Sequence, residues 1–129
     1  MKPAGLLYFA PAVGYMALIF GLSSRPAPAV VHGWPVVLGM KLVHLIEYAL
    51  LAALWLDGFL RGTRLRFFDA ACWTVLIAFA WGILDELHQA FVPGRSPAVT
   101  DAYADLVAAL LTVLLVGAWR RRRVLKSRP

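Results

Sequence analysis

The sequence predicts an all-α fold, an integral membrane bundle of about four transmembrane helices. Of its 129 residues, 61% are apolar and 16% are charged, and the mean hydropathy is +0.72. Soluble domains contain about 45–50% apolar and about 25% charged residues. A chain this short cannot bury so much apolar surface in an aqueous core. The composition therefore argues against a soluble enzyme domain or a disordered tail, and the single Cys72 argues against a disulfide scaffold.

Four apolar stretches support the helix count, at about 5–22, 36–56, 70–91 and 101–119. Each is close to the ~20 residues that a membrane-spanning helix needs. Short linkers separate them, and Pro35 and Pro97 suit the first turns of the helices that follow. We therefore expect one transmembrane domain over residues 1–129, ending in a basic tail at 120–129. An alternative is a cleaved signal peptide at 27–29, although the first apolar run exceeds the usual 7–15 residues.

Basic residues predict the topology. With four spans, the N-terminus, the second linker and the tail share one side and carry ten Lys and Arg residues, whereas the first and third linkers carry two. The positive-inside rule then places both termini in the cytoplasm of a multi-pass cell-membrane protein. The tail alone accounts for the net charge of +6, and directly after an apolar helix it indicates a topology anchor rather than a nucleic-acid site.

The third and fourth helices have apolar runs that are too short for the bilayer. Residues 70–84 and 106–119 cover about 21–23 Å, less than the ~30 Å hydrocarbon core. Their polar outer ends are therefore expected to enter the membrane, beside the start of the second helix. The polar residues concerned are Lys41, His44 and Tyr48 on one face of the second helix, Asp85, Glu86, His88 and Gln89 on the third, and Asp101 and Asp105 on the fourth.

Convergence of these faces predicts a functional site. A charged side chain at membrane depth costs about 2.5–3.5 kcal/mol, so such groups face inward, pair with one another and mark function. One ion pair would be enough to hold a small bundle together, and this cluster exceeds that need. Glu47 lies about 120° from Lys41 around its helix, so it is expected either to partner His44 or to face another helix.

Three activities fit these residue types. In a binding site, Lys41 and Arg95 would hold an anionic group such as a lipid phosphate or a carboxylate of an acylated glycopeptide. The remaining ligand-binding candidates are Ser24, His44, Tyr48, Gln89, Asp101 and Asp105. In a membrane hydrolase or transferase acting on a lipid-linked substrate, His88 would be the general base, oriented by Asp85 or Glu86. The third possible activity is proton- or ion-coupled transport.

A divalent metal is the cofactor that these side chains could hold. Ligand atoms are available from His44, Asp85, His88, Asp101 and Asp105. Their spacing matches no established metal motif, because Asp-Glu-Leu-His-Gln differs from His-Glu-x-x-His. We therefore predict no metal or other cofactor from the sequence.

Four sequence blocks resemble the VanZ-like family of small polytopic membrane proteins. They are Ser23-Ser24-Arg25-Pro26, Lys41-x-x-His44-x-x-x-Tyr48, Asp85-Glu86-x-His88-Gln89-x-Phe91-x-Pro93-Gly94-Arg95 and Asp101-x-x-x-Asp105. The resemblance runs from about residue 18 to 110, and the third block is its most specific part. It implies a helical membrane protein, and it implies a link to teicoplanin resistance, with which the name-giving member is associated. The expected partner is a membrane lipid, a lipid-linked cell-wall intermediate or a lipoglycopeptide.

Overall fold

The computed structural model describes residues 5–26 and 34–126, and nearly all of them are helical. A short 3-10 helix, η1 (Gly5–Phe9), leads into α1 (Ala10–Ser23). Three long helices follow, namely α2 (Trp34–Gly62), α3 (Phe67–Gln89) and α4 (Val99–Lys126). The predicted all-α class is confirmed. The proposed cleavage triplet at 27–29 lies outside the described residues, as do Lys2 and Arg128.

Four of these segments are long and apolar enough to cross a membrane, so the chain is a multi-pass membrane protein. The segments are Gly5–Ser23, Lys41–Gly62, Phe67–Gln89 and Val99–Lys126. Two helices run past the apolar stretches seen in the sequence. The second continues to Gly62, and the fourth continues through the arginine run to Lys126, because Arg and Lys are themselves good helix formers.

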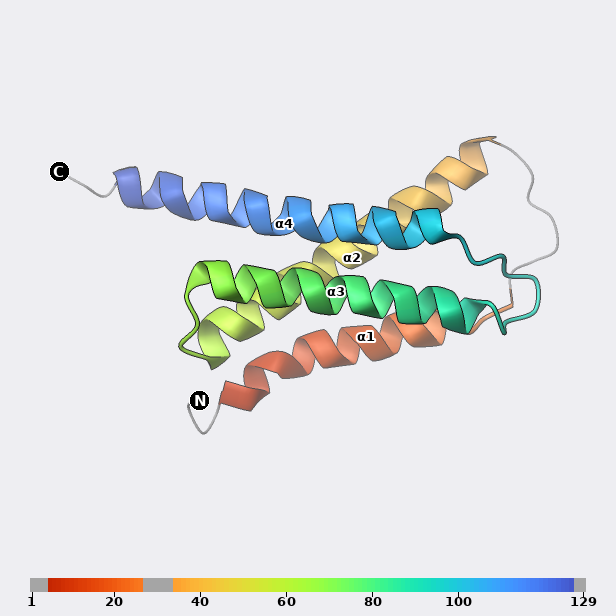
Figure 1. Ribbon diagram of the computed structural model, residues 1–129, viewed down its shortest axis with the longest axis horizontal. Helices are drawn as coiled ribbons and strands as arrows, with labels where there is room; N and C mark the ends of the chain where they lie inside the picture. The colour runs from red at the N-terminus through yellow and green to blue at the C-terminus, as the bar shows by residue number, and fades with distance from the viewer. Residues whose placement is uncertain (1–4, 27–33, 127–129) are drawn as a thin grey trace.

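The helices pack as a bundle in which α2 crosses behind α3 and α4, while α1 lies along α3 (Figure 1). Within the described residues, α1 contacts α2 and α3 but not α4. Ala52, Ala78, Ala108 and Ala109 lie in the main core, and small residues of this kind let helix backbones approach closely in membranes. Large apolar side chains face outward instead, and Leu115 is 69% exposed, as expected for a surface solvated by lipid.

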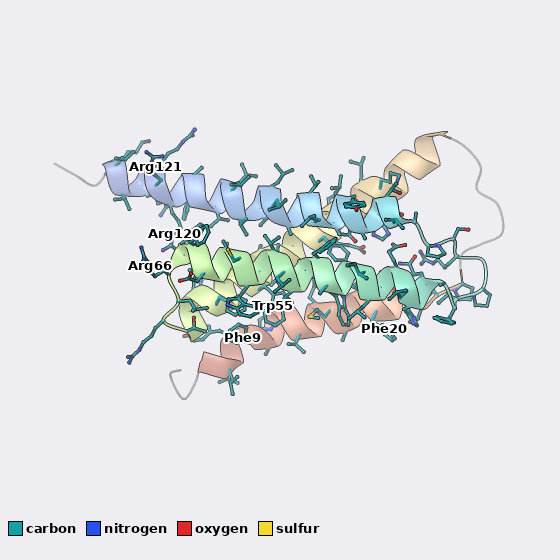
Figure 2. The ribbon with its side chains drawn as sticks, viewed as in Figure 1. Phe9, Phe20, Trp55, Arg66, Arg120 and Arg121 are labelled. Carbon is teal, nitrogen blue, oxygen red and sulfur yellow. The ribbon has the colours of Figure 1, made fainter. Side chains whose placement is uncertain are left out.

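The bundle has two chemically different ends (Figure 1). At one end η1 begins, α2 turns into α3 and α4 stops, and Figure 2 shows Arg66, Arg120 and Arg121 there. We call this the arginine end. At the other end α1 stops, α2 begins and α3 turns into α4. We call this the polar end, because the polar residues of the second, third and fourth helices gather there.

The α3–α4 connection is a tight turn with a specific glycine requirement. Arg95 N donates to Val92 O over 3.1 Å, which closes a turn with Pro93 and Gly94 at its two central positions. Gly94 has φ 77°, the left-handed value that the third residue of a type II turn needs. The turn reverses the chain and places Arg95 beside the end of α1.

The start of α4 differs from the predicted one. Pro97 lies before the helix rather than in its first turn, because the helix begins at Val99. Ala98 explains the difference. Its N–H donates to Glu86 Oε2 over 2.7 Å, and its carbonyl accepts the first helical hydrogen bond from Asp101 N over 2.8 Å. A carboxylate on α3 therefore caps α4 and fixes where it begins.

Candidate functional site

Two polar contacts join α2 to α4 at the polar end. Lys41 Nζ lies 2.6 Å from Asp101 Oδ1, and one turn further into the bundle His44 Nδ1 lies 3.7 Å from Asp105 Oδ1. The side chains become more buried along this series, from 42% exposed for Lys41 to 1% for Asp105. The helical spacing in the sequence thus predicted which faces of α2 and α4 meet.

Tyr48 continues the same face of α2 but lies in the core. Its side chain is fully buried, its ring stacks with that of His44 at 6.5 Å, and its hydroxyl has no hydrogen-bond partner. Space for this packing comes from Gly82 on α3, where a Cβ atom would lie 2.9 Å from Asp105 Oδ2 and 3.4 Å from the Tyr48 ring. Tyr48 therefore positions His44 and Asp105 by packing.

Asp85 is the polar link between α3 and α1. Its carboxylate accepts hydrogen bonds from Ser23 Oγ over 2.5 Å and from Gln89 Nε2 over 2.8 Å, and all three side chains are buried. Sequence reasoning selected Ser24 and missed the role of Ser23. Ser23 shares the inward face of α1 with Ile19, one turn earlier, but α1 is apolar on all sides in the sequence, so spacing alone does not identify that face.

His88 lies beside α1 without a carboxylate partner. Its Nε2 atom is 2.9 Å from Ser24 Oγ, and its ring packs on Phe20 with centroids 4.2 Å apart. Across the described ranges, no carboxylate makes a hydrogen bond or ion pair with it. The predicted general base is therefore present without its predicted orienting acid, since Asp85 is bonded to Ser23 and Gln89, and Glu86 is bonded to Ala98.

Arg95 binds the end of α1. Its Nε and Nη2 atoms donate to the carbonyl oxygens of Arg25 and Leu22 over 3.3 and 3.4 Å. Carbonyls at a helix C-terminus lack helical partners and carry partial negative charge, so they attract a guanidinium. A guanidinium has five N–H donors, and these bonds use two of them. The other three donors make no hydrogen bond among the described residues.

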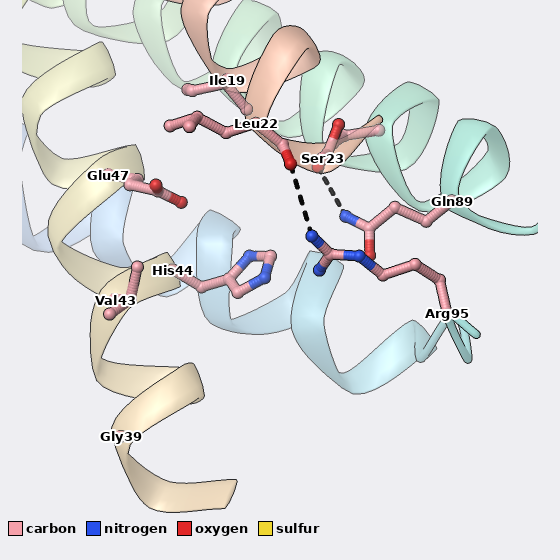
Figure 3. Close-up of a pocket in the computed structure, with 10 residues that line it drawn as sticks. Ile19, Leu22, Ser23, Gly39, Val43, His44, Glu47, Gln89 and Arg95 are labelled. Atoms are coloured by element: carbon pink, nitrogen blue, oxygen red, sulfur yellow. Dashed lines mark hydrogen bonds between the residues drawn. The ribbon is translucent and has the colours of Figure 1, made fainter. Parts of the chain in front are cut away.

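A pocket of about 480 Å³ opens between α1, α2, α3 and Arg95. Figure 3 shows Arg95 reaching toward α1 beside His44, with Glu47 on the same helix as His44. Sequence reasoning placed four of the lining residues in the site, namely His44, Asp85, Gln89 and Arg95; the others are Ile19, Leu22, Ser23, Gly39, Val43 and Glu47. Glu47 was expected either to partner His44 or to face another helix. Its side chain lines the pocket and makes no hydrogen bond or ion pair inside the described part of the chain.

The remaining predicted site residues do not line this pocket. They are Ser24, Lys41, Tyr48, Glu86, His88, Asp101 and Asp105. A subset of these forms a second grouping with His44, because ligand atoms of His44, Glu86 and Asp101 lie within 4.8 Å of one another. Of the five residues considered for a metal in the sequence, His44, Asp101 and Asp105 come together. Asp85 and His88 instead bond to α1.

Comparison with protein families gives one result that covers most of the chain. A family model described as VanZ/LLP1 matches residues 7–120. Comparison with curated proteins and with solved structures gives no match. The matched range contains the pocket and the grouping of His44, Glu86 and Asp101, and of the basic tail it includes only Arg120.

Proposed function

Because the chain belongs to the VanZ-like family, we propose that its pocket binds the polar head of an envelope lipid or of a lipid-linked or acylated ligand. The observation that carries this proposal is a pocket at the polar end that combines charged groups with an apolar rim. Such a pocket suits a ligand that is itself amphipathic.

Arg95 is the proposed anion-binding residue. Its unused donors have the fork geometry that matches a phosphate or carboxylate. Lys41 was the other cation considered, but it lies outside the pocket and is bonded to Asp101. The proposal therefore assigns anion binding to Arg95 alone.

Glu47 sets the second requirement on the ligand. A carboxylate accepts hydrogen bonds and repels anions, and that of Glu47 makes no hydrogen bond or ion pair among the described residues. A head group that carries only negative charge would be repelled by Glu47 where it lines the pocket. We therefore propose a head group with both an anionic group and hydroxyl or amine donors.

The apolar rim suits the acyl part of such a ligand. Ile19, Leu22 and Val43 line the pocket, and Leu22 and Val43 are 38% and 53% exposed. In a membrane these exposed side chains contact acyl chains, so a lipid could insert its head group without leaving the bilayer. This geometry supports lipid entry from the side.

The basic residues support an outward orientation of the pocket. We propose that the arginine end faces the cytoplasm and that the polar end faces outward, as the positive-inside rule requires. A pocket in the outer half of the membrane could take up a lipid-linked cell-wall intermediate or the acyl chain of a lipoglycopeptide. A contribution to teicoplanin resistance would follow from either ligand.

Native mass spectrometry of the protein in lipid nanodiscs tests the proposal. We expect phosphatidylglycerol, which offers a phosphate and hydroxyl donors, to be retained in preference to diacylglycerol, which lacks the phosphate. Arg95→Gln should weaken retention about tenfold or more, because a charge-assisted bidentate contact is worth about 1.5–3 kcal/mol. Glu47→Gln should have a smaller effect.

Arg66→Gln is the matched control, because it removes the same charge at the arginine end. Equal retention of the two lipids, or equal retention by wild type and Arg95→Gln, would contradict the proposal. Teicoplanin susceptibility of cells carrying the same variants tests the resistance link separately.

Hydrolysis or transfer on the bound lipid is a second candidate function, favoured by the 2.9 Å separation of Ser24 Oγ and His88 Nε2. A serine and a histidine at this distance can act as nucleophile and general base. Ser24 also donates to Phe20 O over 2.6 Å, so it would have to turn toward His88 first. Cleavage products in the nanodisc experiment that disappear with His88→Ala, while lipid retention persists, would support turnover; absence of products would leave binding alone.

A further inference from the structure

The polar end holds a second grouping whose chemistry differs from that of the lipid pocket. His44 on α2, Glu86 on α3 and Asp101 on α4 each place one ligand atom within 4.8 Å of the others. Three helices therefore present one imidazole nitrogen and two carboxylate oxygens at one place. Mixed nitrogen and oxygen ligands of this kind suit first-row divalent metal ions.

Asp105 adds an independent observation. Its side chain is 1% exposed, and its Oδ1 atom has no hydrogen-bond partner. That atom lies 3.7 Å from His44 Nδ1, which is likewise buried without a hydrogen bond. A buried polar atom without a hydrogen-bond partner costs about 1–3 kcal/mol, and a cation bound at His44 would offset part of that cost for the Asp105 carboxylate.

Asp105 lies next to this grouping rather than within it. Its Oδ1 atom faces His44 Nδ1 over 3.7 Å, and it is not among the three residues whose ligand atoms converge. A carboxylate beside a metal-binding histidine fixes the orientation of the imidazole ring.

The other two acids are held in place while keeping one oxygen free. Glu86 uses Oε2 to accept the Ala98 N–H, and Asp101 uses Oδ1 to accept from Lys41 and Thr100. Glu86 Oε1 and Asp101 Oδ2 make no hydrogen bond or ion pair inside the described part of the chain. Hydrogen bonds that orient a carboxylate while leaving its second oxygen available are typical of metal ligands.

Charge balance favours a divalent ion. Glu86 and Asp105 are buried, and Asp101 is 23% exposed. Lys41 supplies one positive charge against these three carboxylates. Buried charges are costly unless they are compensated. With His44 neutral, as a metal ligand must be, the grouping has an excess of two negative charges that one divalent cation would neutralise.

We propose that His44, Glu86 and Asp101 bind one divalent transition-metal ion, with Mn²⁺ or Zn²⁺ as the favoured ions, and that Asp105 orients the His44 imidazole. The imidazole distinguishes this site from the all-oxygen sites that Mg²⁺ and Ca²⁺ prefer. His44 also lines the lipid pocket, so the ion would lie at the pocket wall. Metal binding does not depend on the lipid proposal, because none of the three ligands has to contact a lipid.

Equilibrium dialysis of tag-free protein in detergent tests this proposal. After chelator treatment, the protein is dialysed against Mn²⁺ or Zn²⁺, and bound metal is counted by mass spectrometry. We expect about one ion per chain, and affinity about tenfold or more weaker in Asp105→Asn, because losing a carboxylate that orients a metal-binding histidine costs about 10–100-fold. Asp57→Asn is the matched control, because Asp57 is 53% exposed and pairs with Arg61.

Two further measurements keep the test decisive if Asp105→Asn does not fold. Glu86→Gln keeps an oxygen that can accept the Ala98 N–H, so it should fold and still lose affinity. Pulsed electron paramagnetic resonance of bound Mn²⁺ should show nitrogen coupling that disappears in His44→Gln. No bound ion in the wild type, or equal affinity in wild type and Glu86→Gln, would overturn the site, whereas lipid retention in nanodiscs could still be normal.

Discussion

The two ends of this bundle place their charged side chains in opposite environments. At the arginine end, the Arg61–Asp57 pair has side chains 64% and 53% exposed, and Arg123 lies 4.0 Å over the Trp119 ring. At the polar end, the His44–Asp105 contact has side chains 15% and 1% exposed. Burial, rather than the number of charges, therefore separates a solvated end from a candidate site.

The energetic consequences differ accordingly. An exposed ion pair contributes about 0–1 kcal/mol, because water competes for both partners and the side chains lose entropy. Removing one partner of a buried pair costs about 3–5 kcal/mol, because the other charge is left uncompensated. Substitutions at the polar end should therefore affect stability and binding together, while equivalent substitutions at the arginine end should affect neither strongly.

The largest expected difference between the ends comes from two glycines. Gly82→Ala should lower the free energy of unfolding by about 1–3 kcal/mol, because the new Cβ would lie 2.9 Å from Asp105 Oδ2 in a packed interface. Gly117→Ala should change it by less than about 1 kcal/mol, because its Cβ would meet only the Phe67 ring, at 3.1 Å, and Ala favours the helix. Unfolding by sodium dodecyl sulfate in mixed micelles measures both. A smaller loss for Gly82→Ala than for Gly117→Ala would contradict the comparison.

Replacing one cation at each end gives a smaller difference. Lys41→Met should cost about 1–2 kcal/mol, because Asp101, only 23% exposed, would lose its ion pair. Arg61→Met should cost less than about 0.5 kcal/mol, because the Arg61–Asp57 pair is within one helix and exposed. The same mixed-micelle titration applies. Equal losses would mean that the Lys41–Asp101 pair is as well solvated as the pair at the arginine end.

Periodicity in the sequence was sufficient to predict the meeting of α2 and α4. Lys41 and His44 share one face of α2, and Asp101 and Asp105 share one face of α4. Because both polar faces avoid lipid, they pack against each other, and the Lys41–Asp101 and His44–Asp105 contacts form. Contacts made by backbone groups were not predictable in this way. The positions of Arg95 and Glu86 depend on which carbonyls end α1 and which N–H begins α4, and those depend on the register of helices distant in sequence.

Two adjacent serines at the end of α1 illustrate the same limit. Ser23 and Ser24 are adjacent and chemically identical, so composition and spacing cannot separate them. Helix rotation does, because it turns Ser23 to Asp85 inside the bundle and Ser24 to His88 near the edge. The angle of α1 is set by its packing on α2 and α3, which no local pattern encodes.

The smallest effect is expected for Tyr48→Phe, which tests whether the buried Tyr48 hydroxyl contributes to stability or to lipid binding. The Tyr48 hydroxyl is buried without a hydrogen-bond partner, and Tyr48 does not line the lipid pocket. Tyr48→Phe removes that hydroxyl and keeps the ring that packs beside Asp105, so the free energy of unfolding should stay the same or rise by up to about 1 kcal/mol. Phosphatidylglycerol retention should be unchanged. A loss of stability or retention would instead show that the hydroxyl has a partner in the membrane, and Tyr48 would then belong with His44 and Asp105 as a polar group of the site.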